Sequence, residues 1–181
     1  MNKIRVGVIG IGHLGAIHAK IYKELKDCEL AGVCDTDKSR LEEISKTLNV
    51  PGFTSYKELF RISDAISVCT PTKTHHTIAK EVLQHKIHSL VEKPFTPTID
   101  EADDLIETAR KNDLILQVGH IERFNSAFNA TLKIIKHPRF IECHRLSPFP
   151  NRSLDVGAVL DIMIHDIDII LGLVNSPVEK I

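Results

Sequence analysis

Apolar runs rich in β-branched residues alternate with amphipathic stretches along the first two thirds of the chain. The apolar runs are nearly continuous, as in strands that are buried on both faces of a parallel sheet. The amphipathic stretches between them have the spacing of helices that cover such a sheet. We therefore predict strands at Ile4–Ile9, Glu29–Cys34, Ala65–Cys69, Ser89–Val91 and Ile115–Val118, and helices near Leu14–Leu25, Ser39–Leu48, Tyr56–Arg61, Thr74–Gln84 and Ile99–Asn112.

This alternation predicts an α/β fold with a doubly wound parallel sheet of the Rossmann type. We expect a dinucleotide-binding domain over residues 1–119 and the beginning of a second, α+β domain over residues 120–181. The elements predicted in the second domain are a helix over Phe124–Lys136, a strand over Phe140–Arg145, a helix over Val156–Leu173 and a strand from Pro177. Because that last strand has only begun where the sequence stops, we expect the second domain to be incomplete.

A glycine-rich turn follows the first predicted strand and leads directly into a predicted helix. Its sequence is Gly10-Ile11-Gly12-His13-Leu14-Gly15, and Asp35 directly follows the second predicted strand, twenty residues after Gly15. The three glycines allow a tight turn, close approach of a pyrophosphate, and close packing of the helix, in that order. The phosphates would rest on N–H groups near Leu14, and His13 would point to them or to solvent. Incidental glycines in an ordinary turn are the alternative, but this spacing favours a dinucleotide site.

Asp35 also bears on the choice of dinucleotide. A carboxylate at the end of the second strand accepts hydrogen bonds from the ribose hydroxyls of NAD and repels the 2′-phosphate of NADP. Lys38 and Arg40 follow closely and would weaken that repulsion. We therefore predict NAD as the cofactor, with NADP as the second choice.

Composition and charge narrow the possible partners. The 181 residues carry a formal net charge of −1 and no basic run, so we expect no nucleic-acid partner. No apolar run approaches the roughly 18 residues that a membrane span needs, so we expect no membrane partner. The first strand begins at Ile4, which leaves no room for a signal peptide. The four cysteines lack C-x-x-C spacing, so we interpret Cys34 and Cys69 as buried free thiols and expect a cytoplasmic protein.

Four motifs, taken in order, resemble the Gfo/Idh/MocA dehydrogenases, a family that includes glucose-fructose oxidoreductase and inositol dehydrogenase. They are the glycine turn, Thr70-Pro71-Thr72-Lys73-Thr74-His75, Glu92-Lys93-Pro94, and Asp161-Ile162-Met163-Ile164-His165-Asp166-Ile167-Asp168. The resemblance covers essentially the whole chain. It implies a second domain whose open antiparallel sheet carries substrate contacts and the dimer interface, and hence a homo-oligomer for the full-length protein. It also implies a cis peptide bond between Lys93 and Pro94.

The resemblance assigns catalysis to Lys93, Asp161 and His165. Oxidation of a secondary alcohol needs a proton acceptor, and an imidazole titrates near operating pH. Asp161 lies four residues before His165 and so on the same helix face, where it would orient the imidazole or hold the sugar. Lys93 follows a strand at the ligand edge of the sheet, where its cation would stabilise a developing alkoxide. The alternatives are a solvated surface pair and a pair of zinc ligands. Because no third ligand has suitable spacing, we predict no metal.

The resemblance also places Thr70–Thr72 against the nicotinamide half of the cofactor. The full set of predicted cofactor-binding residues is Gly10, Gly12, His13, Leu14, Gly15, Asp35, Thr70, Pro71, Thr72, His75, Glu92 and Lys93. For His75 and its neighbour His76, a capping or exposed position at a helix start is the alternative. His120 and Arg123 follow the last predicted strand of the sheet, where they would face a substrate phosphate or carboxyl. An exposed ion pair with Glu122 is the alternative there.

These motifs predict an oxidoreductase that transfers a hydride between a nicotinamide cofactor and a secondary alcohol of a sugar or nucleotide sugar. Gly119–Asn125 and Arg152–Gly157 resemble family members that act on UDP-activated amino sugars, so the expected substrate is a sugar or UDP-sugar. The alternative is a non-catalytic regulator that senses a dinucleotide. Such a protein has little reason to keep Lys93, Asp161 and His165 together, and this chain has all three.

Overall fold

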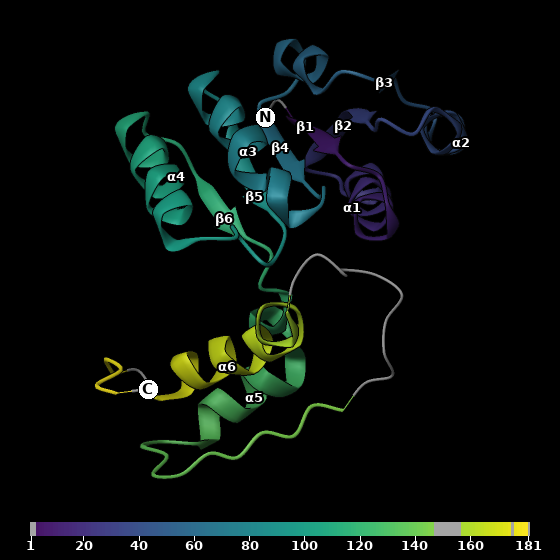
Figure 1. The fold of residues 1–181 in the computed structure, drawn as a ribbon. Coiled ribbons are helices and arrows are strands. Elements are labelled where there is room, and N and C mark those ends of the chain that lie inside the picture. The colour runs from purple at the N-terminus through teal and green to yellow at the C-terminus, as the bar shows by residue number, and fades with distance from the viewer. Residues whose placement is uncertain (1–2, 147–156, 175, 181) are drawn as a thin grey trace. The chain divides into compact units, whose positions relative to one another are not determined.

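The computed structural model describes residues 3–146, 157–174 and 176–180, and the chain divides into two compact units, Met1–Gly119 and His120–Ile181. Within the described residues, the first unit contains six parallel strands in the order β3-β2-β1-β4-β5-β6 (Figure 1). They are β1 (Ile4–Ile9), β2 (Cys28–Cys34), β3 (Gly52–Phe53), β4 (Ala65–Val68), β5 (His88–Val91) and β6 (Leu116–Val118). All five predicted strands are confirmed to within one residue at each end. The additional strand, β3, is too short to show a hydrophobic period.

Helices cover both faces of this sheet (Figure 1). They are α1 (His13–Glu24), α2 (Lys38–Leu48), α3 (His75–Gln84) and α4 (Ile99–Lys111), with short 3-10 helices η1 (Tyr56–Arg61) and η2 (Thr72–Thr74). Residues of α3 and α4 share an apolar cluster with Ile9 and Cys34, whereas residues of α1 and α2 share another with Val8 and Val33. Because neighbouring strand residues point to opposite faces, continuous apolar runs fill both clusters. The predicted doubly wound α/β fold is confirmed, although Tyr56–Arg61 is a 3-10 helix rather than an α-helix.

The carboxyl ends of the central strands meet at one edge of the sheet. Ile9 pairs with Cys34 of β2 and with Val68 of β4, and Val91 of β5 pairs with Val68 and Val118. Backbone hydrogen bonds of 2.8–3.0 Å continue this alignment for one residue past β1, β4, β5 and β6. The strand order reverses between β1 and β4, and doubly wound sheets bind ligands at such a point. We call this end of the sheet the carboxyl edge.

The described part of the second unit contains helices and irregular segments. It contains the 3-10 helix η3 (Ile121–Phe124), α5 (Ser126–Ile134), and a π-helical segment, η4 (Val159–Met163), that runs into α6 (Ile164–Val174). The strands predicted over Phe140–Arg145 and from Pro177 are wrong, since residues 140–146 and 177–180 form no strand. A strand needs a neighbour for its backbone hydrogen bonds, and the described part of this unit offers none.

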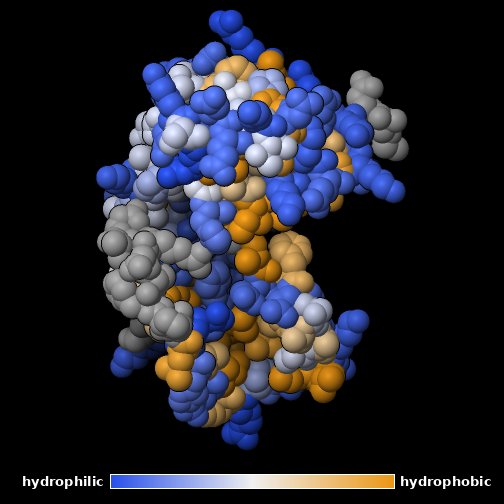
Figure 2. Space-filling model, turned by 90° about the vertical axis from the view of Figure 1, so that its right-hand side faces the viewer, coloured by the Kyte–Doolittle hydropathy of each residue, from blue (hydrophilic) through white to orange (hydrophobic). Residues whose placement is uncertain are grey.

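Large apolar side chains are exposed on the second unit (Figure 2). Those with more than half of their area exposed include Phe124, Ile134, Phe140, Val159 and Met163. Contiguous exposed apolar surface is typical of a face that packs against another element or chain. Among the helices that the structure describes, none is both long and apolar enough to cross a membrane.

Candidate functional site

The glycine turn after β1 forms a cradle at the carboxyl edge. Gly10 has a φ of +80°, and a Cβ there would lie 2.8 Å from the carbonyl oxygen of Cys69. A Cβ at Gly15 would lie 1.8 Å from the carbonyl oxygen of Gly10, so only glycine lets α1 approach the turn this closely. A Cβ at Gly12 would meet no described atom within 4 Å, which leaves the backbone there open to a ligand. The turn therefore fits a pyrophosphate, which the N–H groups of the first turn of α1 would bind.

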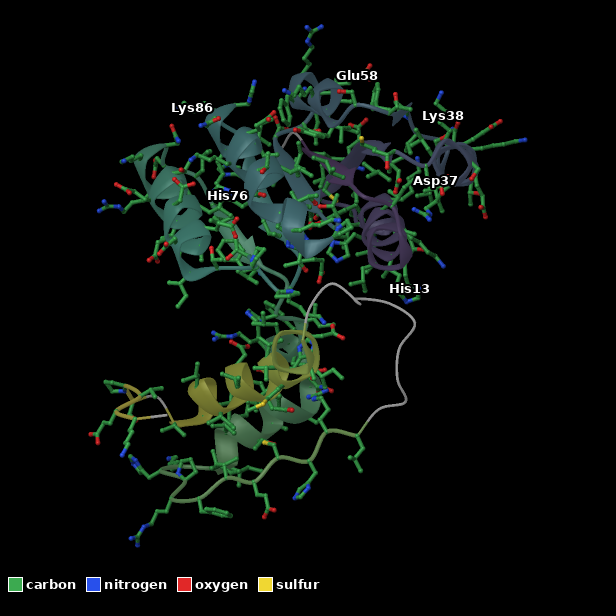
Figure 3. The ribbon with its side chains drawn as sticks, in the orientation of Figure 1. His13, Asp37, Lys38, Glu58, His76 and Lys86 are labelled. Atoms are coloured by element: carbon green, nitrogen blue, oxygen red, sulfur yellow. The ribbon has the colours of Figure 1, made fainter. Side chains whose placement is uncertain are left out.

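The predicted contacts in the first turn of α1 are His13 and Leu14. Both side chains are exposed, and Figure 3 shows His13 at the start of α1. Their backbone N–H groups belong to the helix end that favours anions. Contact of either residue with a dinucleotide stays a prediction.

Asp35 follows β2 and joins the glycine turn to the loop before α2. Its Oδ2 accepts a hydrogen bond from the backbone N–H of Ile11 at 2.9 Å, and its Oδ1 accepts one from the backbone N–H of Asp37 at 2.9 Å. The side chain is 9% exposed. An ionised carboxylate accepts about four hydrogen bonds, so acceptor capacity remains for a ribose diol. Asp35 thus orders the turn itself, which spacing alone does not reveal.

Arg40 is the cation placed beside Asp35. Its Nη1 lies 3.4 Å from Oδ2 of Asp35, and its Nη2 lies 3.4 Å from Oδ2 of Asp37. Lys38, the first residue of α2, is exposed (Figure 3). Of the two predicted cations, Arg40 is therefore the one positioned to reduce repulsion between Asp35 and a 2′-phosphate.

The loop after β4 carries the predicted nicotinamide contacts Thr70, Pro71 and Thr72. The hydroxyl of Thr74 lies 2.8 Å from Oγ1 of Thr70 and 2.7 Å from the carbonyl oxygen of Pro71, and so closes the loop. Pro71 is exposed, whereas Thr72 is buried. Pro71 is thus the member of the trio whose side chain is most open to a ligand.

His75 lies beneath this loop and is 1% exposed. Its Nε2 lies 2.7 Å from the carbonyl oxygen of Thr70, and its Nδ1 lies 3.0 Å from the carbonyl oxygen of Pro94. The alternative of an exposed position is therefore wrong for His75, whose ring ties the loop after β4 to the loop after β5. Its direct contact with a cofactor stays a prediction. His76 pairs with Asp104 at 2.6 Å and joins α3 to α4 (Figure 3).

Glu92, Lys93 and Pro94 follow β5 at the carboxyl edge. The peptide bond between Lys93 and Pro94 is cis, as the family resemblance implies. Oε2 of the buried Glu92 accepts the backbone N–H of Lys93 at 3.2 Å, and Nε2 of His18 lies 3.0 Å from Oε1. Burial alone would raise the pKa of Glu92, but the hydrogen bonds from His18 and Lys93 outweigh it and lower that pKa. The site therefore holds an ionised carboxylate next to Lys93.

His18 is the residue of this site that sequence reasoning missed. The buried positions of α1 are Gly15 and Ala19, and His18 and Tyr22 lie beside that face at a helical spacing of four residues. A helical projection of α1 could have placed His18 toward the sheet. The projection could not have identified Glu92 as the partner of His18, because Glu92 lies far along the sequence, directly after β5.

Two of the four polar residues predicted in the last helix are held by arginines. Nε of Arg123 donates to Asp168 at 2.8 Å, and Nε of Arg145 donates to Asp166 at 3.0 Å. The hydrogen bond from Arg123 lowers the pKa of Asp168. Arg123 thus pairs with Asp168. The alternative, an exposed ion pair between Arg123 and Glu122, is not the pair that the structure describes. These pairs give Asp166 and Asp168 a structural role within the second unit.

Asp161 and His165 are both half-buried on the last helix. Asp161 lies in the π-helical segment η4, and His165 is the second residue of α6. A π-helical turn is wider than an α-helical one, so the i, i+4 spacing gives a less direct alignment than predicted. Such segments occur frequently at functional sites. Of the Arg152–Gly157 motif, residues 152–156 lie outside the described residues, as does Val156 of the predicted helix.

A cavity of about 500 Å³ lies in the second unit beside α6. Its lining is mainly apolar, with Arg145 and Asp166 among the lining residues. Neither Asp161 nor His165 lines it. This cavity is therefore distinct from the surface that carries the candidate catalytic pair.

The structure brings the predicted cofactor-binding residues of the first unit to one edge. Each group of these residues follows a strand, and the carboxyl ends of neighbouring strands are aligned. The groups are the glycine turn after β1, Asp35 after β2, the Thr70 loop after β4 and Glu92–Lys93 after β5. Asp161 and His165 belong to the second unit. Their convergence with Lys93 stays a prediction.

The chain is similar to known oxidoreductases in sequence and in fold. Residues 4–120 match the model of an oxidoreductase family, Gfo/Idh/MocA, described by its NAD-binding Rossmann fold. The chain is 41% identical over 181 residues to UDP-N-acetylglucosamine 3-dehydrogenase of Acidithiobacillus ferrooxidans, and the match covers 99% of this chain and 57% of that protein. A solved structure of that dehydrogenase from the same organism matches with a TM-score of 0.93 at 40% identity, covering 99% of this chain and 59% of that one.

A second relative has a different substrate. Myo-inositol 2-dehydrogenase of Thermotoga maritima is 30% identical over 192 aligned positions, which cover 98% of this chain and 57% of that protein. The chain thus spans 57% of the length of both relatives.

Proposed function

The chain belongs to the Gfo/Idh/MocA family of oxidoreductases with an NAD-binding Rossmann fold, and from this premise we propose that the protein is an NAD-dependent dehydrogenase of a UDP-linked sugar. The observation that carries the proposal is the alignment of the glycine turn, Asp35 and Glu92–Lys93 along one sheet edge. Support for a UDP-sugar comes from the 41% identity to a UDP-N-acetylglucosamine 3-dehydrogenase, against 30% for an inositol dehydrogenase.

In this proposal, residues of the chain accept the proton and stabilise the negative charge that develops in the reaction. Bound NAD supplies the acceptor for the hydride that leaves the carbinol carbon. His165 takes the hydroxyl proton as general base, and Lys93 donates a hydrogen bond to the same oxygen as negative charge develops there. Asp161 orients the imidazole or the substrate. With the hydride accounted for by the cofactor, His165 would hold the hydroxyl proton and Lys93 would hold the oxygen as it becomes a carbonyl.

We infer the cellular compartment of the protein from its cysteines and its oligomeric state from its family. All four cysteines of the described residues are free thiols. Burial raises the pKa of Cys34 to about 12 and raises that of Cys69, which keeps both thiols protonated. Free thiols of this kind are typical of a reducing compartment, which supports our inference of a cytoplasmic protein. By the resemblance to its family, the full-length protein is a homo-oligomer.

The test is a kinetic assay of the full-length protein that carries this chain. Reduced nicotinamide is followed by its absorbance with UDP-N-acetylglucosamine, other UDP-sugars and free sugars as substrates. His165→Ala and Lys93→Ala should each lower kcat by about 10²–10⁴-fold, as expected for loss of an acid–base or oxyanion group. Matched controls are His144→Ala and Lys111→Ala, whose side chains are exposed and pair with Glu142 and Glu107.

Turnover of a UDP-sugar with the stated loss in both variants supports the proposal. Turnover of free sugars alone would move the substrate assignment to the inositol-dehydrogenase branch. If NAD binds and no substrate turns over, the dinucleotide-sensing regulator becomes the better account.

A further inference from the structure

A chain of polar side chains runs through the buried face of α1 in the first unit. The hydroxyl of Tyr22 lies 2.8 Å from Oγ of Ser67, and Oγ of Ser67 lies 3.4 Å from Nδ1 of His18. The other ring nitrogen of His18, Nε2, lies 3.0 Å from Oε1 of Glu92. Ser67 is 1% exposed and Glu92 is 6% exposed. The chain thus connects α1 and β4 to the residue before Lys93.

Three groups surround the carboxylate of Glu92, and two of them are polar partners. His18 faces Oε1, and the backbone N–H of Lys93 donates to Oε2 at 3.2 Å. On a third side lies Gly119, where an added Cβ would lie 2.8 Å from Oε1. A buried charge is stable only when hydrogen-bonded partners surround it. His18 is a side-chain partner that the structure places 3.0 Å from this charge.

We propose that His18 is a positioning residue of the active site, which holds the Glu92 carboxylate and, through it, the backbone of Lys93. The inference deepens the proposed dehydrogenase function and rests on it for its kinetic consequence. Without the imidazole of His18, the carboxylate loses the partner at its Oε1 and shifts or takes up a proton. The N–H of Lys93 then loses a fixed acceptor, and the ammonium moves relative to the reacting oxygen. A misplacement of about 1 Å costs roughly 10²-fold in rate.

The geometry also specifies where the imidazole proton lies. A carboxylate only accepts hydrogen bonds, so the 3.0 Å contact with Glu92 favours hydrogen on Nε2 of His18. On the other side of the ring, Nδ1 faces the hydroxyl of Ser67, which can donate or accept. Tyr22 lies at the far side of that hydroxyl and does not contact the imidazole through a hydrogen bond that the structure describes. The two ring nitrogens of His18 thus face Ser67 in β4 and Glu92 directly after β5.

The kinetic test compares three variants of the full-length protein. His18→Leu removes both ring nitrogens, His18→Gln keeps an amide N–H that reaches Glu92, and Tyr22→Phe removes only the hydroxyl at the far end. We expect His18→Leu to lower kcat at least about 10-fold with substrate KM and NAD affinity within about 3-fold, because positioning acts on the transition state. His18→Gln should recover most of that loss, and Tyr22→Phe should stay within about 2-fold of the parent.

A spectroscopic test needs neither substrate nor turnover. Nitrogen-15 NMR of the imidazole in the full-length protein without ligands reports which ring nitrogen carries hydrogen. We expect hydrogen on Nε2 of His18, and a shift of its resonances in Glu92→Gln. A bare Nε2, or equal loss of kcat in His18→Leu and His18→Gln, would overturn the proposal even if the wild type is a dehydrogenase. If the wild type turns nothing over, the proposed function fails, while the NMR result still tests the contact with Glu92.

Discussion

At the scale of single residues, two carboxylates at the carboxyl edge hold backbone N–H groups in place. Asp35 accepts from Ile11 in the glycine turn, and Glu92 accepts from Lys93. Hydrogen bonds to ionised groups are shorter and stronger than neutral ones, so both loops are ordered before a ligand arrives. The motifs predicted both acids as ligand contacts. The structure adds their role within the loops. For Asp35 this role depends on a tertiary contact, because Asp35 and Ile11 lie 24 positions apart in the sequence.

Two glycine substitutions separate binding from folding. In Gly12→Ala the new Cβ meets open space, so the melting temperature should stay near that of the parent while NAD affinity falls about 10-fold or more, because the Cβ occupies the pyrophosphate path. In Gly15→Ala the Cβ collides with the turn, so both the melting temperature and NAD affinity should fall. Calorimetry and fluorescence titration measure the two effects. A Gly12→Ala variant with unchanged NAD affinity would contradict the pyrophosphate assignment.

The choice between NAD and NADP also belongs to individual residues. We expect tighter binding of NAD, because Asp35 repels a 2′-phosphate and a net like-charge contact of this kind costs about 1–3 kcal/mol. Arg40 lies 3.4 Å from Asp35 and offsets part of that repulsion, so Arg40→Ala should increase the preference for NAD. Parallel titrations with the two cofactors give the ratio. Tighter binding of NADP to the parent would refute the assignment.

At the scale of elements, the sheet was predictable because each of its central strands is buried on both faces. Ile9 and Val8 belong to the apolar clusters on the two faces of the sheet. Because both faces must be apolar, the sequence of the strand is a continuous apolar run. The two-residue β3 leaves no such trace. Phe140–Arg145 has a strand-like composition but lies among residues that form no strand, because composition cannot supply a hydrogen-bonding neighbour. The local sequence pattern therefore predicts strands that pair with other strands of the same sheet. It wrongly predicts a strand where no neighbouring strand is present to accept its hydrogen bonds.

The ion pair between β1 and the residue before β4 gives the first unit a pH-dependent stability. Nε of Arg5 donates to Asp64 at 3.0 Å, and this pair lowers the pKa of Asp64 from 3.8 to about 2. A depressed pKa in the folded state stabilises above the unfolded value and is lost as pH falls through the folded value. Asp64→Asn should therefore lower the urea midpoint slightly at pH 7, and the difference should shrink as the pH falls from about 4 through about 2. A difference at pH 2 as large as that at pH 7 would show that the carboxylate charge is not its source.

At the scale of the whole molecule, the candidate catalytic residues are divided between the two units. Lys93 lies in the first unit with the cofactor-binding edge, whereas Asp161 and His165 lie in the second. The motif order in the sequence predicted this division, since the acid and the imidazole come after the Rossmann domain. The proposed mechanism then requires one substrate oxygen to meet residues of both units. The chain spans 57% of the length of its relatives, so this requirement belongs to the full-length protein.

The central claim is that Lys93 and His165 act on the same oxygen. The most direct measurement is a crystal structure of the full-length protein with NAD and a UDP-sugar bound. We expect Nζ of Lys93 and Nε2 or Nδ1 of His165 each within about 3.2 Å of one sugar hydroxyl, with its carbon beside the nicotinamide. A ternary complex in which these two side chains face different cavities would contradict the account.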